Sequence, residues 1–128
     1  MREGVIQVKS YDFASRIVKA YRYLTAEQKE FVLSKQLLRS GTSIGANVEE
    51  AMAGSSRADF ANKLAIAAKE ARETRYWLRL LHDNAYLPES AFASLEAQCS
   101  ELIKILNSIL LTTKNGKPSQ DSPSDPAV

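Results

Sequence analysis

The sequence predicts an all-α fold, an antiparallel four-helix bundle with up-down-up-down topology. Three observations lead to this prediction. Apolar residues recur at three- and four-residue steps in four successive segments, which is the period of one face of an α-helix. The breaks between these segments are short, and short links place neighbouring helices antiparallel. Strand signals are nearly absent, with no sustained alternation of apolar and polar residues and no hairpin turn.

The first predicted helix runs from about Ser10 to Leu24. Its apolar face consists of five residues at helical spacing, Phe13, Ile17, Ala20, Tyr21 and Leu24. The second predicted helix begins at Thr25, because the run TAEQ matches a capping box formed by Thr25 and Gln28. Its core stripe is Leu33, Leu37, Gly41, Ile44, Val48 and Met52.

The stretch SGTSIGANVEEA, residues 40–51, is rich in residues that form helices poorly. The apolar period nevertheless continues through it, so we predict helix, although each Gly costs about 1 kcal/mol relative to Ala. The stretch lacks the spacing and the Gly-Lys-Ser/Thr ending of a phosphate-binding loop. Small residues at Gly41 and Gly45 instead indicate either a local kink or a close approach by another helix.

The run AGSSRAD separates the second and third helices, with Gly54 ending one and Ser56 capping the next. The third helix ends near Asn84, and its core stripe is Phe60, Leu64, Ala67, Ala71, Thr74, Leu78 and Leu81. Pro88 suits the start of the fourth helix. That helix fades after Thr113, and its seam is Phe92, Leu95, Cys99, Leu102, Leu106 and Ile109.

These segments place one bundle at residues 1–114 and a flexible polar tail at 115–128, where Pro and Ser are frequent. A single Cys among 128 residues excludes an internal disulfide and is typical of a reducing cytoplasm. No apolar run resembles a signal peptide or a membrane span. A lone Cys99 and a lone His82 do not make a zinc site, and no catalytic set can be assembled from this sequence. We therefore expect a cytoplasmic, non-enzymatic protein that uses no cofactor and no metal, contacts no membrane and has no identifiable small-molecule ligand.

One polar sector of the second helix has three possible roles. It contains Gln36, Arg39, Ser43, Asn47 and Glu50. It is either a solvated face, a polar seam that hydrogen-bonds to another helix, or, least expected, a catalytic site. Ser and Asn form helices poorly, so they are unusual on a helix surface that only faces solvent. Glu70 borders the core of the third helix and needs a partner there. Arg39 and Asn47 are the candidates.

The third helix carries the main basic feature, opposite its core stripe: Lys69, Arg72, Arg75, Tyr76 and Arg79. These side chains either pair along the helix, contact another subunit, or bind RNA or DNA through phosphates with Tyr76 stacking on a base. A net charge of only +2 does not by itself indicate nucleic acid. Small residues precede this face and indicate a partner helix in the same chain or in another subunit: Ala58, Ala61, Ala65 and Ala68.

The segments RSGTSIGANVEEA and SSRADFANKLAIAAKEARETRYWLRLL resemble a family of small bacterial proteins. Their genes were first met as reading frames inside intervening sequences of large-subunit ribosomal RNA genes. The family pattern places Arg39, Ser43-Ile44, Asn47 and Glu50 in the second helix, and residues 69–81 match its KEA-ET-YWL-LL segment. The run VEEAMAG departs from the Ala-Glu-Gly ending of many relatives.

This resemblance implies an antiparallel four-helix bundle that forms homopentameric rings. It also implies a distant similarity to the accessory protein of diversity-generating retroelements, which binds nucleic acid and a reverse transcriptase. We therefore expect a self-assembling scaffold or binding module, with oligomer contacts at Gly41, Gly45 and the alanines of the third helix. The alternative is an RNA- or DNA-binding protein that uses the basic face of the third helix.

Overall fold

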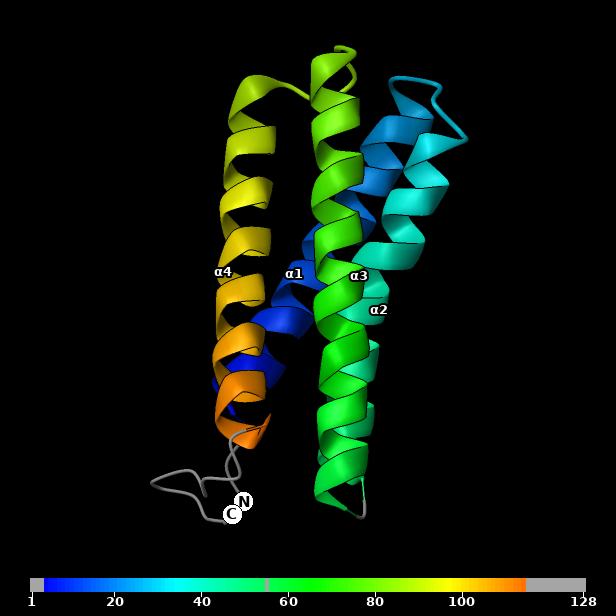
Figure 1. The fold of residues 1–128 in the computed structure, drawn as a ribbon. Helices are drawn as coiled ribbons and strands as arrows, with labels where there is room; N and C mark the ends of the chain where they lie inside the picture. The colour runs from blue at the N-terminus through cyan, green and yellow to red at the C-terminus, as the bar shows by residue number, and fades with distance from the viewer. Residues whose placement is uncertain (1–3, 55, 115–128) are drawn as a thin grey trace.

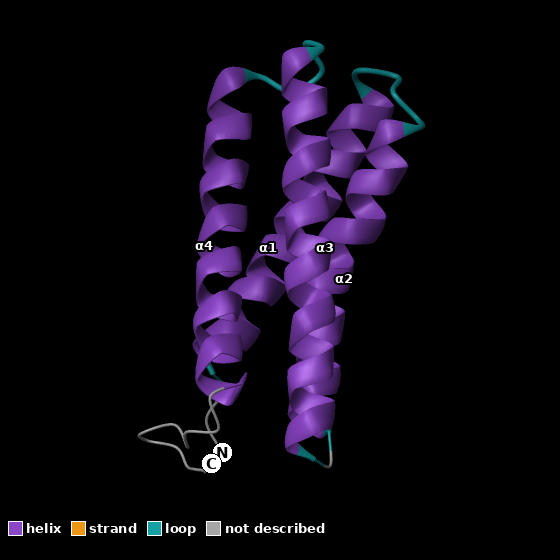
Figure 2. Cartoon of the chain, in the orientation of Figure 1, coloured by secondary structure: helices purple, strands orange, loops and turns teal. Residues whose placement is uncertain are grey.

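In the computed structural model, which describes residues 4–54 and 56–114, the chain folds into four α-helices. They are α1 (Val5–Ala26), α2 (Leu33–Ala53), α3 (Arg57–Asp83) and α4 (Glu89–Lys114). Successive helices run in opposite directions, and the described part of the chain contains no strand (Figures 1 and 2). The predicted all-α bundle is confirmed. The predicted tail, residues 115–128, lies outside the described residues.

The helices are packed so that each contacts its neighbours in the chain. Helix α2 lies between α1 and α3, and α4 packs on α3. Helix α1 crosses the bundle obliquely and packs less closely on α4 than on α2, while α1 and α3 are diagonal and their backbones do not approach each other closely in the described structure (Figure 1). No helix in the described residues is both long enough and apolar enough to cross a membrane.

A single apolar core runs between the helices. It contains most residues of the predicted stripes, including the fully buried side chains Phe13, Ile17, Leu37, Ile44, Val48, Leu64, Leu78, Leu81, Leu102 and Leu106. One prediction at the end of α2 is wrong, because Met52 is 40 % exposed and Ala51 is buried in its place. The stripe takes a three-residue step after Val48, since the helical period is 3.6 residues rather than four.

The predicted start of the second helix is also wrong. Thr25 lies in the last turn of α1, where its hydroxyl donates to the carbonyl oxygen of Tyr21 at 2.9 Å. Helix α1 begins at Val5 rather than near Ser10. The TAEQ run therefore ends a helix instead of starting one, because the hydroxyl of Thr25 finds a backbone acceptor one turn earlier.

Helix α2 is instead started by Glu30. Its carboxylate accepts the backbone N–H groups of Val32, Leu33 and Ser34 at 3.1, 2.9 and 2.6 Å. Burial of Glu30 opposes its charge, but these three hydrogen bonds outweigh that cost and lower the pKa of the carboxyl below its ordinary value. One carboxylate thus satisfies three of the unpaired N–H groups at the helix start.

The other helix boundaries agree with the sequence prediction. Ser56 caps α3, because its side-chain oxygen accepts the N–H of Asp59 at 3.0 Å. Helix α3 ends at Asp83, and Pro88 immediately precedes α4 and accepts the N–H of Phe92 at 3.0 Å. These short links hold the four helices antiparallel.

Candidate functional site

The small residues of α2 bring that helix close to α1 of the same chain. Gly41 is buried, and a methyl group added there would lie 2.8 Å from Cγ1 of Ile17. At Gly45 the same addition would lie 3.3 Å from the backbone oxygen of Ser10. The expected close approach by another helix is therefore made within one chain. Gly41 is not available to a second subunit, which corrects its assignment as an oligomer contact.

On its other side, α2 is joined to α3 by a buried pair of hydroxyl groups. Ser40 and Thr74 are both buried, and their side-chain oxygens lie 2.9 Å apart. The Thr74 oxygen is also 2.8 Å from the carbonyl oxygen of Glu70. The sequence placed Thr74 in the core stripe but did not identify Ser40 as its partner. The sequence did offer one signal for a buried Ser40, because this residue directly precedes Gly41, a member of the predicted core stripe of α2.

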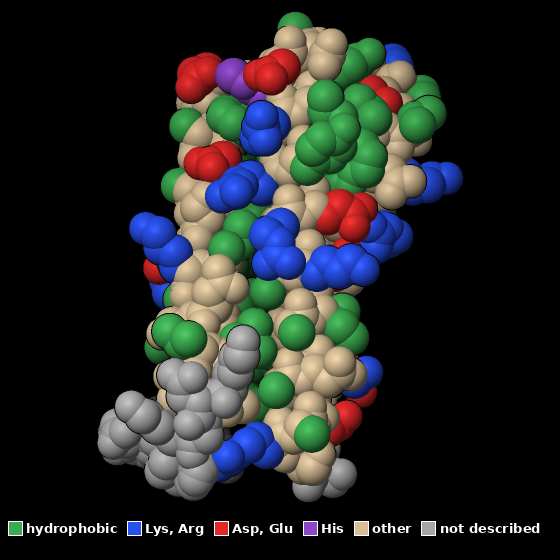
Figure 3. Space-filling model, viewed as in Figure 1, with side chains coloured by type: hydrophobic (Ala, Val, Ile, Leu, Met, Phe, Trp, Pro, Cys, Tyr) green, Lys and Arg blue, Asp and Glu red, His purple; other side chains and the backbone are tan. Residues whose placement is uncertain are grey.

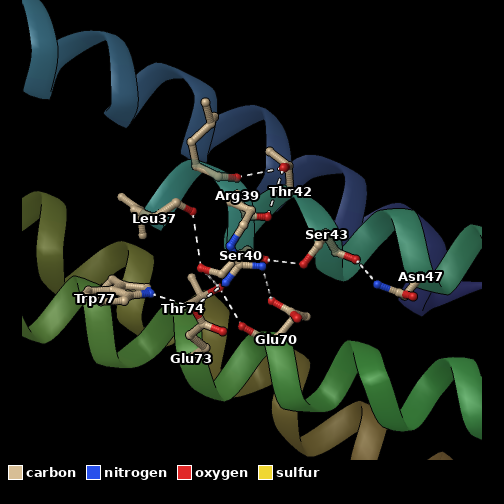
Figure 4. A network of polar contacts seen from close by, with 11 residues as sticks. Leu37, Arg39, Ser40, Thr42, Ser43, Asn47, Glu70, Glu73, Thr74 and Trp77 are labelled. Carbon is tan, nitrogen blue, oxygen red and sulfur yellow. Dashed lines mark hydrogen bonds and ion pairs between the residues drawn. The ribbon is translucent and has the colours of Figure 1, made fainter. Parts of the chain in front are cut away.

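An ion-pair network lies at the solvent edge of the same contact (Figure 4). Arg39 binds Glu70 at 3.2 Å and also binds Glu73, whose carboxylate accepts the indole N–H of Trp77 at 3.0 Å. The hydrogen bond from Trp77 and then that from Arg39 hold the pKa of Glu73 below its ordinary value. Of the two candidate partners for Glu70, Arg39 is the one that contacts it, whereas Asn47 does not.

The rest of the polar sector does not reach α3. The Ser43 hydroxyl donates to the carbonyl of Ser40 at 3.0 Å, and the Asn47 amide donates to the carbonyl of Ser43 at 2.8 Å. Glu50 is exposed. The predicted polar seam is therefore an interhelical contact at Arg39 only, because Ser43 and Asn47 bond to carbonyl groups of their own helix.

The basic residues of α3 form an exposed face, called here the α3 basic face: Lys69, Arg72, Arg75, Tyr76 and Arg79. Figure 3 shows Lys and Arg side chains gathered across the middle of the surface formed by α3 and α4. Lys69, Arg72 and Arg79 are exposed, and in the described structure they make no ion pair. Arg75 is half-buried and lies 3.5 Å from the hydroxyl of Ser100 on α4.

Two details of this face bear on the alternatives from the sequence. Lys69 and Glu73 form no direct ion pair in the described structure, although the charge of Lys69 helps to lower the pKa of Glu73, whose carboxylate is bound by Arg39. Tyr76 is 52 % exposed and meets the ring of Trp77 edge-on at 5.0 Å. The basic face therefore presents both accessible cations and an exposed aromatic ring.

The alanines upstream on α3 divide into two groups. Ala68 is buried within the chain, so it is not an oligomer contact, which corrects that assignment. Ala58 and Ala65 are exposed and Ala61 is half-buried. These three remain accessible to a partner, because a single chain does not cover them fully.

The two residues with potentially reactive side chains, Cys99 and His82, both pack against other residues of the bundle. Cys99 is fully buried, its thiol donates to the carbonyl of Ala71 at 3.1 Å, and burial raises its pKa to about 12. His82 lies in the last turn of α3, 2.7 Å from the Glu89 carboxylate, and its ring stacks on Phe92 at 4.1 Å. Within residues 4–54 and 56–114, no cluster of three or more potential metal ligands occurs.

The buried hydroxyl pair gives a testable consequence. Thr74→Val keeps the shape of the side chain but leaves the buried Ser40 hydroxyl with only its long 3.5 Å hydrogen bond to the carbonyl oxygen of Leu37, so we expect a loss of about 1–2 kcal/mol in unfolding free energy. Urea denaturation measures this loss. Ser40→Ala/Thr74→Val should recover part of it, because neither hydroxyl is then left unpaired. Thr112→Val, a change on α4, is the control, and an equal effect of the two Thr→Val variants would contradict the role of the pair.

Known proteins resemble this chain in both sequence and fold. The family model described as 23S rRNA-intervening sequence protein matches residues 2–108. A crystal structure of a protein of unknown function from the S23 ribosomal protein family of Bacteroides thetaiotaomicron is 55 % identical, with a TM-score of 0.82. That match covers 83 % of this chain and 98 % of the other. Among curated proteins, none matches the chain significantly. Matching segments, helix order and overall fold together show that the chain belongs to the 23S rRNA-intervening sequence protein family.

Proposed function

We propose that this protein is a non-enzymatic scaffold or binding module that assembles from several copies of the chain in the cytoplasm. The observation that carries the proposal is the apolar surface that one copy leaves in solvent. Tyr11 is 71 % exposed and lines one depression with Val8, which is 44 % exposed, and Val5 at the start of α1 is 62 % exposed. Apolar groups gathered on one exposed face are typical of an interaction surface.

The exposed alanines of α3 support the same proposal. Ala58 and Ala65 project from a helix face where a solvated surface would favour Lys and Glu. Small side chains let a second helix come close and bury backbone and Cβ atoms together. The family resemblance sets the expected number of copies at five, which corresponds to about 71 kDa, five times the 14.2 kDa chain.

Light scattering on a sizing column tests this assembly. We expect the wild-type protein to have a mass of several chains and Ala65→Glu to lower it toward 14.2 kDa, because a buried carboxylate at a contact is costly. Ala97→Glu makes the same change at an exposed position of α4 and should leave the mass unchanged. A wild-type mass of one chain would contradict the assembly, and an unchanged mass of Ala65→Glu would remove α3 from the interface.

The second candidate function is binding of RNA or DNA at the α3 basic face. The observation that favours it is that Arg72 and Arg79 are exposed and, in the described residues, unpaired on either side of the exposed Tyr76. Cations neutralise phosphates, and an aromatic ring between them stacks on an unpaired base. Several copies in one assembly would multiply a weak site by avidity.

Fluorescence anisotropy with a labelled single-stranded RNA tests this candidate. Arg72→Ala/Arg79→Ala should weaken binding and reduce the slope of log affinity against log salt by about 0.7 for each phosphate that is no longer neutralised. Lys35→Ala/Lys104→Ala removes the same charge from exposed positions on α2 and α4 and serves as the control. Equal effects of the two double variants would exclude the α3 basic face as the specific site.

A further inference from the structure

We propose that copies of this chain join head to tail, with the α3 basic face of one copy seated on a groove between α1 and α2 of the next. The inference rests on the proposed self-assembly and identifies both halves of the contact. Three features carry it: two depressions beside an exposed tyrosine, opposite charges on the two surfaces, and the positions of α1 and α3 in the bundle.

The first feature is the α1–α2 groove, which consists of two depressions that share Tyr11 and Glu49. One has a volume of about 270 Å³ and is lined mainly by small residues of the two helices: Ser10, Ala14, Thr42, Gly45 and Ala46. The other has a volume of about 310 Å³ and adds Gln7, Val8 and Asp12. Gly45 and Ala46 keep the floor low, so a side chain from outside can enter beside Tyr11.

The second feature is charge. Asp12 and Glu49 at the rim of the groove are exposed and form no ion pair with any described residue. On α3, Arg72 and Arg79 are exposed and likewise unpaired, with Tyr76 between them. The two surfaces thus offer opposite charges around exposed aromatic rings. Such complementarity favours the correct orientation and opposes like-charged pairings.

The third feature is topology. Helices α1 and α3 are diagonal in the bundle, so the outward surface of α1 and that of α3 face different sides of the molecule (Figure 1). A contact between these two different surfaces is heterologous. Each copy binds the next through its α3 basic face, and its own α1–α2 groove holds the α3 basic face of the copy before it. Such contacts repeat around a closed ring when the rotation between copies closes.

Charge reversal tests the pairing directly. Asp12→Lys/Glu49→Lys gives two basic surfaces, and Arg72→Glu/Arg79→Glu gives two acidic surfaces. Each variant alone should fall to a single chain of 14.2 kDa by light scattering. An equimolar mixture should regain a multi-chain mass, because each surface then meets the opposite charge on the other variant. The two variants must alternate, which a ring of five does not allow at every contact, so the mixture should form open or even-membered assemblies rather than the wild-type ring. Glu27→Lys and Lys104→Glu are single charge reversals outside both surfaces and should keep the wild-type mass.

The outcomes separate this inference from the proposed function. Folding of each variant is verified by circular dichroism before its mass is compared. If the wild-type protein assembles but both reversal variants keep its mass, or their mixture stays monomeric, the head-to-tail contact is overturned while self-assembly stands. If Arg72→Glu/Arg79→Glu loses only RNA binding at unchanged mass, the basic face serves nucleic acid and the contact is likewise overturned. A monomeric wild type would instead refute self-assembly itself.

Discussion

The contact between Gly41 of α2 and Ile17 of α1 determines how near the first two helices lie. Any side chain at Gly41 would meet Ile17 at 2.8 Å, so the two helices pack at this distance only with glycine there. The opposite side of α2 is joined to α3 by the buried Ser40–Thr74 pair and by Arg39 at its edge. Helix α2 therefore holds the bundle together by small residues on one side and polar contacts on the other.

Periodicity in the sequence was enough to predict the four helices, most of the core and the helical state of residues 40–51. Periodicity failed to predict where the second helix begins, because local hydrogen bonds determine that boundary. Thr25 bonds back to Tyr21 instead of capping α2, and the cap is Glu30, which lies outside any standard capping pattern. The pairing of Ser40 with Thr74 joins residues far apart in the chain, so only the relative rotation of α2 and α3 reveals it.

The candidate binding surfaces were likewise predicted only in part from the sequence. The basic residues of α3 were recognisable because their spacing puts them on one side of a helix, and within the described residues none of them forms a direct ion pair with a carboxylate. Gly41 and Ala68 were misassigned to an oligomer contact, since sequence alone does not distinguish a neighbour in the same chain from one in another copy. The groove beside Tyr11 was missed altogether, because it arises from two helices at once.

The most direct measurement of the central constraint is a double-mutant cycle between Gly41→Ala and Ile17→Ala, followed by urea denaturation. Alanine favours a helix over glycine by about 1 kcal/mol, yet we expect Gly41→Ala to destabilise the protein by about 1–3 kcal/mol, because it overpacks against Ile17. In the Ile17→Ala background, the same substitution should cost little or stabilise. A gain in stability from Gly41→Ala alone would contradict the account, since it would mean that α1 and α2 do not depend on the missing side chain.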